Sequence, residues 1–204
     1  MIRRPSHPST CTNMSLSLAK RILMSSPEKS SIVIRPMQPD DLEQVREIDR
    51  LSFSLPWPES AFQYELKANR AALLWVAELA SIPEERKVVG MIVVWLIVDE
   101  AHIATIAVHP DFRGQGIGQR LLSTALQQAI RKGATQAMLE VRAGNEAAQD
   151  LYRRFGFEVA YRRPRYYRDN HEDALLMNLT GMDEEYLEWL EDSSTGQWRY
   201  KRET

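Results

Sequence analysis

Arg113-Gly114-Gln115-Gly116-Ile117-Gly118 is a glycine-rich hexamer that follows an apolar run at 103–108 and precedes an amphipathic segment. A strand, a glycine turn and a helix in this order leave free backbone N–H groups at the positive end of the helix dipole. Glycine has no Cβ, so the backbone can close around an anion there. The hexamer therefore predicts a main-chain anion site, and a pyrophosphate is the expected guest. A tight turn with a helix cap is the alternative interpretation.

Two common nucleotide-binding motifs do not fit the hexamer. It has no Gly-Lys-Ser/Thr ending, which a P-loop requires, and its glycines do not have the G-x-G-x-x-G spacing of dinucleotide-binding proteins. The pattern is instead Arg-x-x-Gly-x-Gly. It indicates a different carrier of a pyrophosphate.

The composition is typical of one compact domain. The chain has 204 residues, of which 44% are hydrophobic, and this is enough for a sizeable core. A net charge of −2 argues against a general nucleic-acid binder. Cys11 is the only cysteine, so we expect no disulfide framework, no cysteine-rich metal site and no thiol nucleophile in the core. No apolar run reaches the roughly 18 residues of a membrane span, and we expect a cytoplasmic protein without a membrane partner.

Residues 1–30 differ from the rest of the chain. Four basic residues and many serines precede the first acidic residue, Glu28. This composition is typical of a disordered leader, and Met14 or Met24 is an alternative start of a shorter protein. It also matches an organelle-targeting peptide, which leaves an organellar location open as the alternative.

The hydrophobic pattern predicts one domain at 31–180. Runs rich in Val and Ile predict strands, and apolar residues at helical spacing predict helices. Asp40 is the expected cap of the first helix. The predicted order is strand 32–34, helices 40–51 and 58–69, strands 73–79, 88–98 and 102–108, helix 117–132, strand 137–142, helix 145–154, and strands 157–161 and 174–179. Residues 181–204 add an acidic amphipathic helix at 183–192 and a flexible tail.

The chain resembles the GNAT superfamily of N-acetyltransferases. The Arg-x-x-Gly-x-Gly hexamer is similar to the acetyl-CoA signature of that superfamily, and Ile106-Ala107-Val108-His109-Pro110 is similar to the strand end that precedes it. The order of elements also matches. The resemblance implies an α/β (α+β) fold, the GNAT fold, with one mixed central sheet of about seven strands, about four flanking helices and here an added C-terminal helix.

Within the superfamily the chain resembles the bacterial RimI type, which acetylates the amino terminus of a ribosomal protein. The motifs that carry this resemblance occur in order along the chain: Pro56-Trp57, the run Leu139-Glu140-Val141-Arg142-Ala143-Gly144-Asn145, Leu151-Tyr152, Phe155-Gly156-Phe157 and Tyr166-Tyr167. The resemblance implies that acetyl-CoA is the acyl donor and that no metal takes part. It also implies that the acceptor is a protein N-terminus, with a ribosomal protein as the partner.

Acetyl transfer from a thioester to an amine requires a held cofactor, a neutral amine and a proton for the departing thiolate. Backbone amides at the strand end can pair with the pantetheine, and those of the hexamer can bind the pyrophosphate. An ordinary core strand is compatible with the first of these roles. The expected cofactor-binding residues are Ile106, Ala107, Val108, Arg113, Gly114, Gln115, Gly116, Ile117, Gly118, Gln119 and Asn145.

Glu140 is the candidate general base. Strand alternation puts Leu139 and Val141 on one face and Glu140 on the other, beside Arg142. From the residues alone, a solvated edge carboxylate or an arginine partner is the commoner role for such a residue, and a salt bridge to Arg142 would weaken Glu140 as a base. The resemblance implies the catalytic role, because the family places a glutamate in this strand to deprotonate the amine.

Tyr152 is the candidate general acid. A phenol with an ordinary pKa near 10 keeps its proton at neutral pH and can donate it to a nascent thiolate. Tyr152 lies seven residues after Asn145, the expected cap of this helix, so the two share a helical face. A tyrosine that only packs, with its hydroxyl at the surface, is the alternative. The resemblance implies that this tyrosine points at the thioester.

The acceptor is harder to predict. An α-amine with a pKa near 8 is neutral far more often at pH 7 than lysine near 10.4, and the difference is worth roughly 3 kcal/mol. This favours a protein N-terminus, with lysine or a small-molecule amine as the alternative acceptor and a non-catalytic acyl-CoA-binding module as a third possibility. Trp57, Tyr166 and Tyr167 are the expected walls for a peptide, although local loop packing explains them equally well. Arg162, Arg163, Arg165 and Arg168 predict a basic loop nearby.

Overall fold

The computed structural model describes residues 31–80, 86–192 and 198–200. The chain separates into a unit at Met1–Ser31 and a unit at Ile32–Thr204, and the second unit is described below. The predicted leader at 1–30 lies outside the described residues, as does most of the predicted flexible tail. The domain limits at 31–180 and 181–204 stay predictions. None of the helices in the described ranges is both long enough and apolar enough to cross a membrane.

One mixed sheet of seven strands organises the described chain, as predicted. The strands lie in the order β1-β2-β3-β4-β5-β7-β6, and every neighbouring pair is antiparallel except β4 and β5, which are parallel. Their bounds are β1 Ile32–Pro36, β2 Ala72–Leu79, β3 Lys87–Ile97, β4 Glu100–Val108, β5 Gln136–Arg142, β6 Glu158–Arg163 and β7 Ala174–Thr180.

Five α-helices accompany the sheet in the described residues: α2 Leu42–Ser52, α3 Ala61–Lys67, α4 Ile117–Arg131, α5 Glu146–Arg154 and α6 Glu184–Asp192, with short 3-10 turns at Pro39–Asp41 and Pro110–Phe112. The prediction of four flanking helices and a C-terminal helix is confirmed. The predicted cap at Asp40 is wrong, because the 3-10 turn precedes α2 and the buried neighbour Asp41 accepts from Gln38 N instead. A bidentate pair with Arg35 holds that carboxylate in place.

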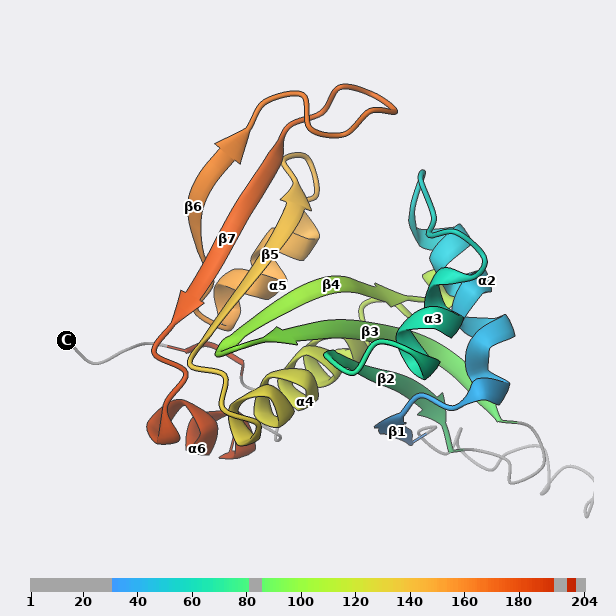
Figure 1. The fold of residues 1–204 in the computed structure, drawn as a ribbon, viewed down its shortest axis with the longest axis horizontal. Helices are drawn as coiled ribbons and strands as arrows, with labels where there is room; N and C mark the ends of the chain where they lie inside the picture. The colour runs from blue at the N-terminus through green and yellow to red at the C-terminus, as the bar shows by residue number, and fades with distance from the viewer. Residues whose placement is uncertain (1–30, 81–85, 193–197, 201–204) are drawn as a thin grey trace, which may run out of the picture. The chain divides into compact units, whose positions relative to one another are not determined.

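Helices cover both faces of the strands β2 to β4. In Figure 1, α4 lies below these strands, and α2 and α3 lie at their right-hand side. The core accordingly has two clusters. One contains Leu121 of α4 and Ile92 of β3, and the other contains Ile48 of α2, Phe62 of α3 and Met91 of β3. β3 is buried on both sides, which explains why its sequence is a continuous apolar run rather than an alternating one.

The strands β4 and β5 separate along their length, and this separation creates the site. They pair only from Glu100 to Ile103 on β4 and from Gln136 to Leu139 on β5. Beyond those residues β4 keeps its pairing with β3, while β5 continues with β7. Figure 1 shows the group of β5, β6 and β7 rising away from β4 at this point. Residues 105–108 therefore present one backbone edge to an opening instead of to a strand.

Candidate functional site

The glycine hexamer forms the turn between β4 and α4. Gly114 and Gly116 have φ of 77° and 76°, a left-handed conformation that glycine adopts without strain, and Gly116 is the N-cap of α4. Arg120 N, bonded to Gly116 O at 3.1 Å, makes the first hydrogen bond of the helix. Within the described residues, no acceptor is present for the backbone N–H groups of 114–119. The turn therefore has the free donors that a diphosphate requires.

The side chain of Arg113 anchors this turn. Its Nε donates to Val108 O at 3.0 Å and one of its terminal nitrogens donates to Ser52 Oγ at 3.1 Å. The guanidinium thus ties the end of β4 to the C-terminal end of α2. The backbone amides, rather than this side chain, are free to meet an anion.

A cleft of about 840 Å³ runs from this turn through the gap between β4 and β5. It contains almost all of the predicted site residues, from Trp57 and Tyr167 to Glu140, Asn145, Tyr152, the strand end at 106–108 and the turn. Of the predicted residues, Gln115 and Tyr166 do not line it. The cleft also has lining residues that were not predicted: Ser52, Phe53, Ser54, Leu55, Ile103, Ala104, Thr105, Phe112, Val141, Arg142, Ala147, Ala148, Asp150, Leu151 and Arg154.

Glu140 lies on β5, where its neighbours Leu139 and Val141 are buried on the opposite face, as predicted. Its ion-pair partner is Arg163 on β6, which donates to Oε1 at 2.6 Å. The hydroxyl of Tyr166 donates to Oε2 at 3.2 Å. Arg142, the alternative partner from the sequence, instead pairs with Asp169 and Glu172. Arg163 and Tyr166 do not line the cleft, so they contact the Glu140 carboxylate from outside the cleft.

Tyr152 lies on α5 with its ring buried and packed against Phe157, at 5.9 Å between ring centroids. Its hydroxyl has no hydrogen-bond partner within the described residues. Burial, with a smaller contribution from Tyr167, raises the pKa of Tyr152 above the ordinary value of a phenol. The hydroxyl therefore keeps its proton at neutral pH. Asn145 begins the same helix, and its side chain accepts from Ala148 N at 3.1 Å, which confirms the predicted cap.

Trp57 lines the cleft and belongs to an aromatic cluster with Phe62 and Trp95. The ring of Trp57 stacks on Phe62 at 5.0 Å and faces Trp95 at 6.3 Å between centroids. The backbone N–H of Trp57 donates to Asp49 Oδ2 at 2.7 Å, which fixes the loop that carries it. Burial raises the pKa of Asp49, although the bond from Trp57 acts in the other direction.

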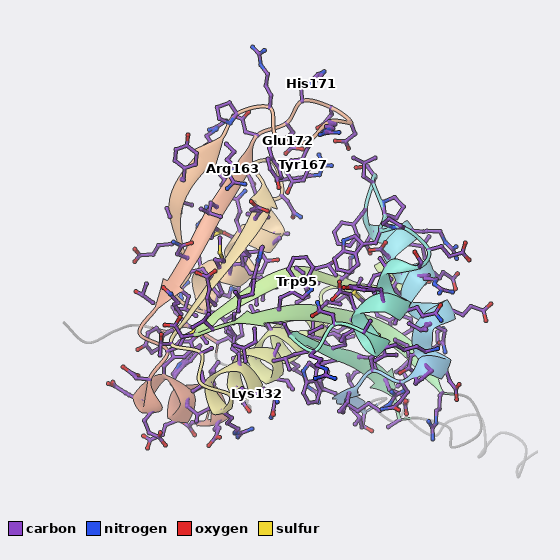
Figure 2. The ribbon with its side chains drawn as sticks, in the orientation of Figure 1. Trp95, Lys132, Arg163, Tyr167, His171 and Glu172 are labelled. Atoms are coloured by element: carbon purple, nitrogen blue, oxygen red, sulfur yellow. The ribbon has the colours of Figure 1, made fainter. Side chains whose placement is uncertain are left out.

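Tyr167 lines the cleft from the loop between β6 and β7. Figure 2 shows Tyr167, Glu172 and Arg163 grouped at the upper end of β5 to β7, with Trp95 below them on β3. Burial raises the pKa of Tyr167 to about 12. Tyr166 is 41% exposed, lies outside the cleft lining and bonds to Glu140. Its position favours a role in holding that carboxylate over the predicted role as a wall.

The predicted basic loop is only partly a loop. Arg162 and Arg163 belong to β6, which runs two residues further than expected. Both are paired, Arg162 with Asp173 at 2.7 Å and Arg163 with Glu140. Neither partner could be predicted from local sequence, because each pair joins residues on two different strands or on a strand and a loop.

The family model described as "Acetyltransferase (GNAT) family" matches residues 42–157. A Bacillus subtilis (strain 168) protein, provisionally named a ribosomal protein bS18-alanine N-acetyltransferase, is 37% identical over 152 residues, which are 74% of this chain and 97% of the relative.

Solved structures give the same result. The crystal structure of the ribosomal-protein-S18-alanine N-acetyltransferase from Escherichia coli has a TM-score of 0.66 and 30% identity, over 74% of this chain and 94% of that one. A Bacillus anthracis protein described as a streptothricin acetyltransferase, solved in complex with acetyl coenzyme A, has a TM-score of 0.60 and 25% identity over 74% of this chain and 98% of that one.

Proposed function

This chain belongs to the acetyltransferase (GNAT) family, and on that basis we propose that it acetylates the N-terminal α-amine of a protein, with a ribosomal protein as the acceptor. The chain is an acyltransferase, and acetyl-CoA is its acyl donor. The observation that supports the proposal best is the single cleft that contains the glycine turn, Glu140 and Tyr152 along one path.

The residues present fit acetyl-CoA. The free amides of 114–119 would hold its diphosphate, and the unpaired edge of β4 at 106–108 would pair with its pantetheine. Asn145 lines the cleft at the start of α5 and would contact the same arm. Bound acetyl-CoA supplies the acetyl group as an activated thioester.

The protein's own groups move two protons. Glu140 accepts a proton from the attacking amine, directly or through a water molecule, while Arg163 and Tyr166 fix the direction of its carboxylate. Tyr152 donates its proton to the departing sulfur. One C–N bond forms and one C–S bond breaks, so a neutral amide and a free thiol result.

The α-amine is favoured over lysine because about one-tenth of it is neutral at pH 7, which leaves less work for a carboxylate base. Trp57 and Tyr167 supply rigid aromatic walls for the end of a peptide. A ribosomal-protein acceptor agrees with the names of the relatives and would place the enzyme in the cytoplasm, where ribosomes assemble.

Mass spectrometry of peptide acetylation tests the proposal. The panel contains an alanine-starting peptide from a ribosomal protein, the same peptide with a blocked N-terminus and one added lysine, and a polyamine. We expect acetylation of the free N-terminus alone. Preferred modification of lysine or the polyamine would replace the acceptor, and binding of acetyl-CoA without turnover of any amine would favour the non-catalytic module.

A further inference from the structure

Two loops from distant parts of the sequence meet over the part of the cleft that Trp57 and Tyr167 line, where the acceptor amine is proposed to bind. One loop follows α2 and carries Ser54 and Trp57, and the other joins β6 to β7 and carries Tyr167 and Asp169. Ser54 Oγ donates to Asp169 Oδ2 across 115 residues of sequence. Figure 1 shows the two loops facing each other above the opening between the halves of the sheet.

Arg142, at the end of β5, holds both loops. One terminal nitrogen of its guanidinium donates to Asp169 at 2.8 Å and to Ser54 Oγ at 3.0 Å. The other donates to Glu172 and to Asn170, each at 3.1 Å. One side chain thus joins a strand end to the two loops on either side of the cleft.

The same guanidinium also fixes an aromatic wall. Its central carbon lies 3.9 Å from the ring centroid of Tyr167, which is a close cation–π contact. Glu172 supports the arrangement from the other side, because its carboxylate accepts from Gly144 N at 2.7 Å and its carbonyl accepts from Tyr167 N at 3.0 Å. Figure 2 shows Tyr167 and Glu172 side by side in this loop.

We propose that Arg142 is a positioning residue for the acceptor: its guanidinium joins the two loops through Ser54 and Asp169 and holds the ring of Tyr167 in place beside them. The proposal rests on the proposed function, because it assumes that this end of the cleft receives the amine. Only a planar fork of donors reaches all these partners at once, and an ammonium group does not. Arg142 acts through the loops and takes no part in the proton transfers.

A second arginine in the same region serves as the matched control. Arg162 on β6 also makes an ion pair, with Asp173 at 2.7 Å, but this pair stays within the β6–β7 hairpin and lies outside the cleft lining. Loss of the Arg162 pair removes a surface contact of the same chemical type. It leaves the connection between the two loops intact.

The experiment compares Arg142→Met, Arg142→Lys and Asp169→Asn with Arg162→Met. Steady-state kinetics with the alanine-starting peptide give KM for the peptide and for acetyl-CoA separately. We expect Arg142→Met to raise the peptide KM about tenfold, because the variant loses a network of charge-assisted hydrogen bonds. The acetyl-CoA KM should change less than twofold. Arg142→Lys and Asp169→Asn should raise the peptide KM by a smaller factor, and Arg162→Met should leave it within twofold.

Hydrogen exchange measured by mass spectrometry tests the connection between the two loops without any acceptor. Arg142→Met and Asp169→Asn should speed exchange in both 53–60 and 164–173, whereas Arg162→Met should leave 53–60 unchanged. Unchanged exchange in 53–60 in both Arg142→Met and Asp169→Asn overturns the proposal, as does an unchanged peptide KM in Arg142→Met. If the wild-type enzyme acetylates no peptide amine, the proposed function fails, and the exchange result alone decides whether Arg142 joins the loops.

Discussion

Replacing Tyr152 with phenylalanine removes one hydroxyl from the cleft and leaves the ring in place. The ring is 6% exposed and packs against Phe157, and these contacts persist in the variant. The hydroxyl has no protein partner among the described residues, so its removal leaves no buried group unpaired. The free energy of unfolding should therefore change by less than about 0.5 kcal/mol.

The effect on catalysis should be far larger. The departing thiolate loses its proton donor, and general acid catalysis by a placed side chain contributes about 10²–10⁴-fold. We expect kcat of Tyr152→Phe to fall about 10²- to 10³-fold, which is roughly 3–4 kcal/mol of activation free energy. The KM for acetyl-CoA should stay within twofold.

Tyr186→Phe is the matched control. The Tyr186 hydroxyl donates to Phe155 O at 2.8 Å in the core, and Tyr186 lies on α6 outside the cleft lining. Its loss leaves a buried carbonyl without this donor and should lower the free energy of unfolding by about 1–2 kcal/mol. Because the change is remote from the chemistry, kcat should stay within twofold of the wild type.

Thiol release at saturating acceptor measures kcat, and urea unfolding measures stability, for both variants. The two substitutions should give opposite patterns, with activity lost in Tyr152→Phe and stability lost in Tyr186→Phe. A kcat for Tyr152→Phe within threefold of the wild type refutes the assignment of the acid. An equal loss of turnover and acetyl-CoA affinity would make Tyr152 a binding residue instead.

Three further substitutions test the base, the turn and a buried charge. Glu140→Gln should lower kcat about 10²-fold at unchanged acetyl-CoA affinity, and a kcat close to that of the wild type would remove Glu140 as the base. Gly118→Val should raise the calorimetric Kd for acetyl-CoA about 100-fold because its methyl groups obstruct the approach of an anion. The fold should persist, since an added Cβ meets its nearest atoms at 3.6 and 3.8 Å, and an unaltered Kd would contradict the anion site. Asp49→Asn keeps an acceptor for the N–H of Trp57 and removes a buried carboxylate, whose pKa is raised by burial. A raised pKa means that the ionised carboxylate is unfavourable in the folded state. The wild-type protein therefore has its full stability below the unfolded pKa of Asp49, where the group is protonated, and loses part of it as the pH rises through the folded pKa. Asp49→Asn should therefore be more stable than the wild type by about 1 kcal/mol at pH 7 and equally stable near pH 3; the same difference in urea unfolding at both pH values would disprove this.

Local sequence signals predicted much of the site. The glycine turn before α4, the cap at Asn145 and the direction of Glu140 on its strand each depend on residues within a few positions of one another. Such features follow from backbone sterics and strand alternation. The element boundaries were less accurate: β6 runs two residues further than predicted, to Arg163, and α2 begins at Leu42, after a 3-10 turn at Pro39–Asp41.

Long-range partners could not be predicted. The sequence offered Arg142 as an alternative ion-pair partner for Glu140, yet the carboxylate pairs with Arg163, 23 residues away on another strand. Asp169 lies in a charged loop, and nothing near it in the sequence indicates Ser54 as its partner. A charged side chain can choose among many opposite charges, and only the packed backbone brings one of them within 3 Å.

The amino-acid sequence by itself determined the class of chemistry, since a main-chain anion site needs only glycines between a strand and a helix, and the motifs around it match one family. The tertiary structure decided how that chemistry is arranged. The parting of β4 from β5 after Ile103 and Leu139 creates the cleft, and Arg142 and Arg163 complete it with contacts between separate strands and loops. The physical reason is that backbone conformation is governed by neighbouring residues, whereas the pairing of charges and the opening of a sheet are settled only when distant segments pack together.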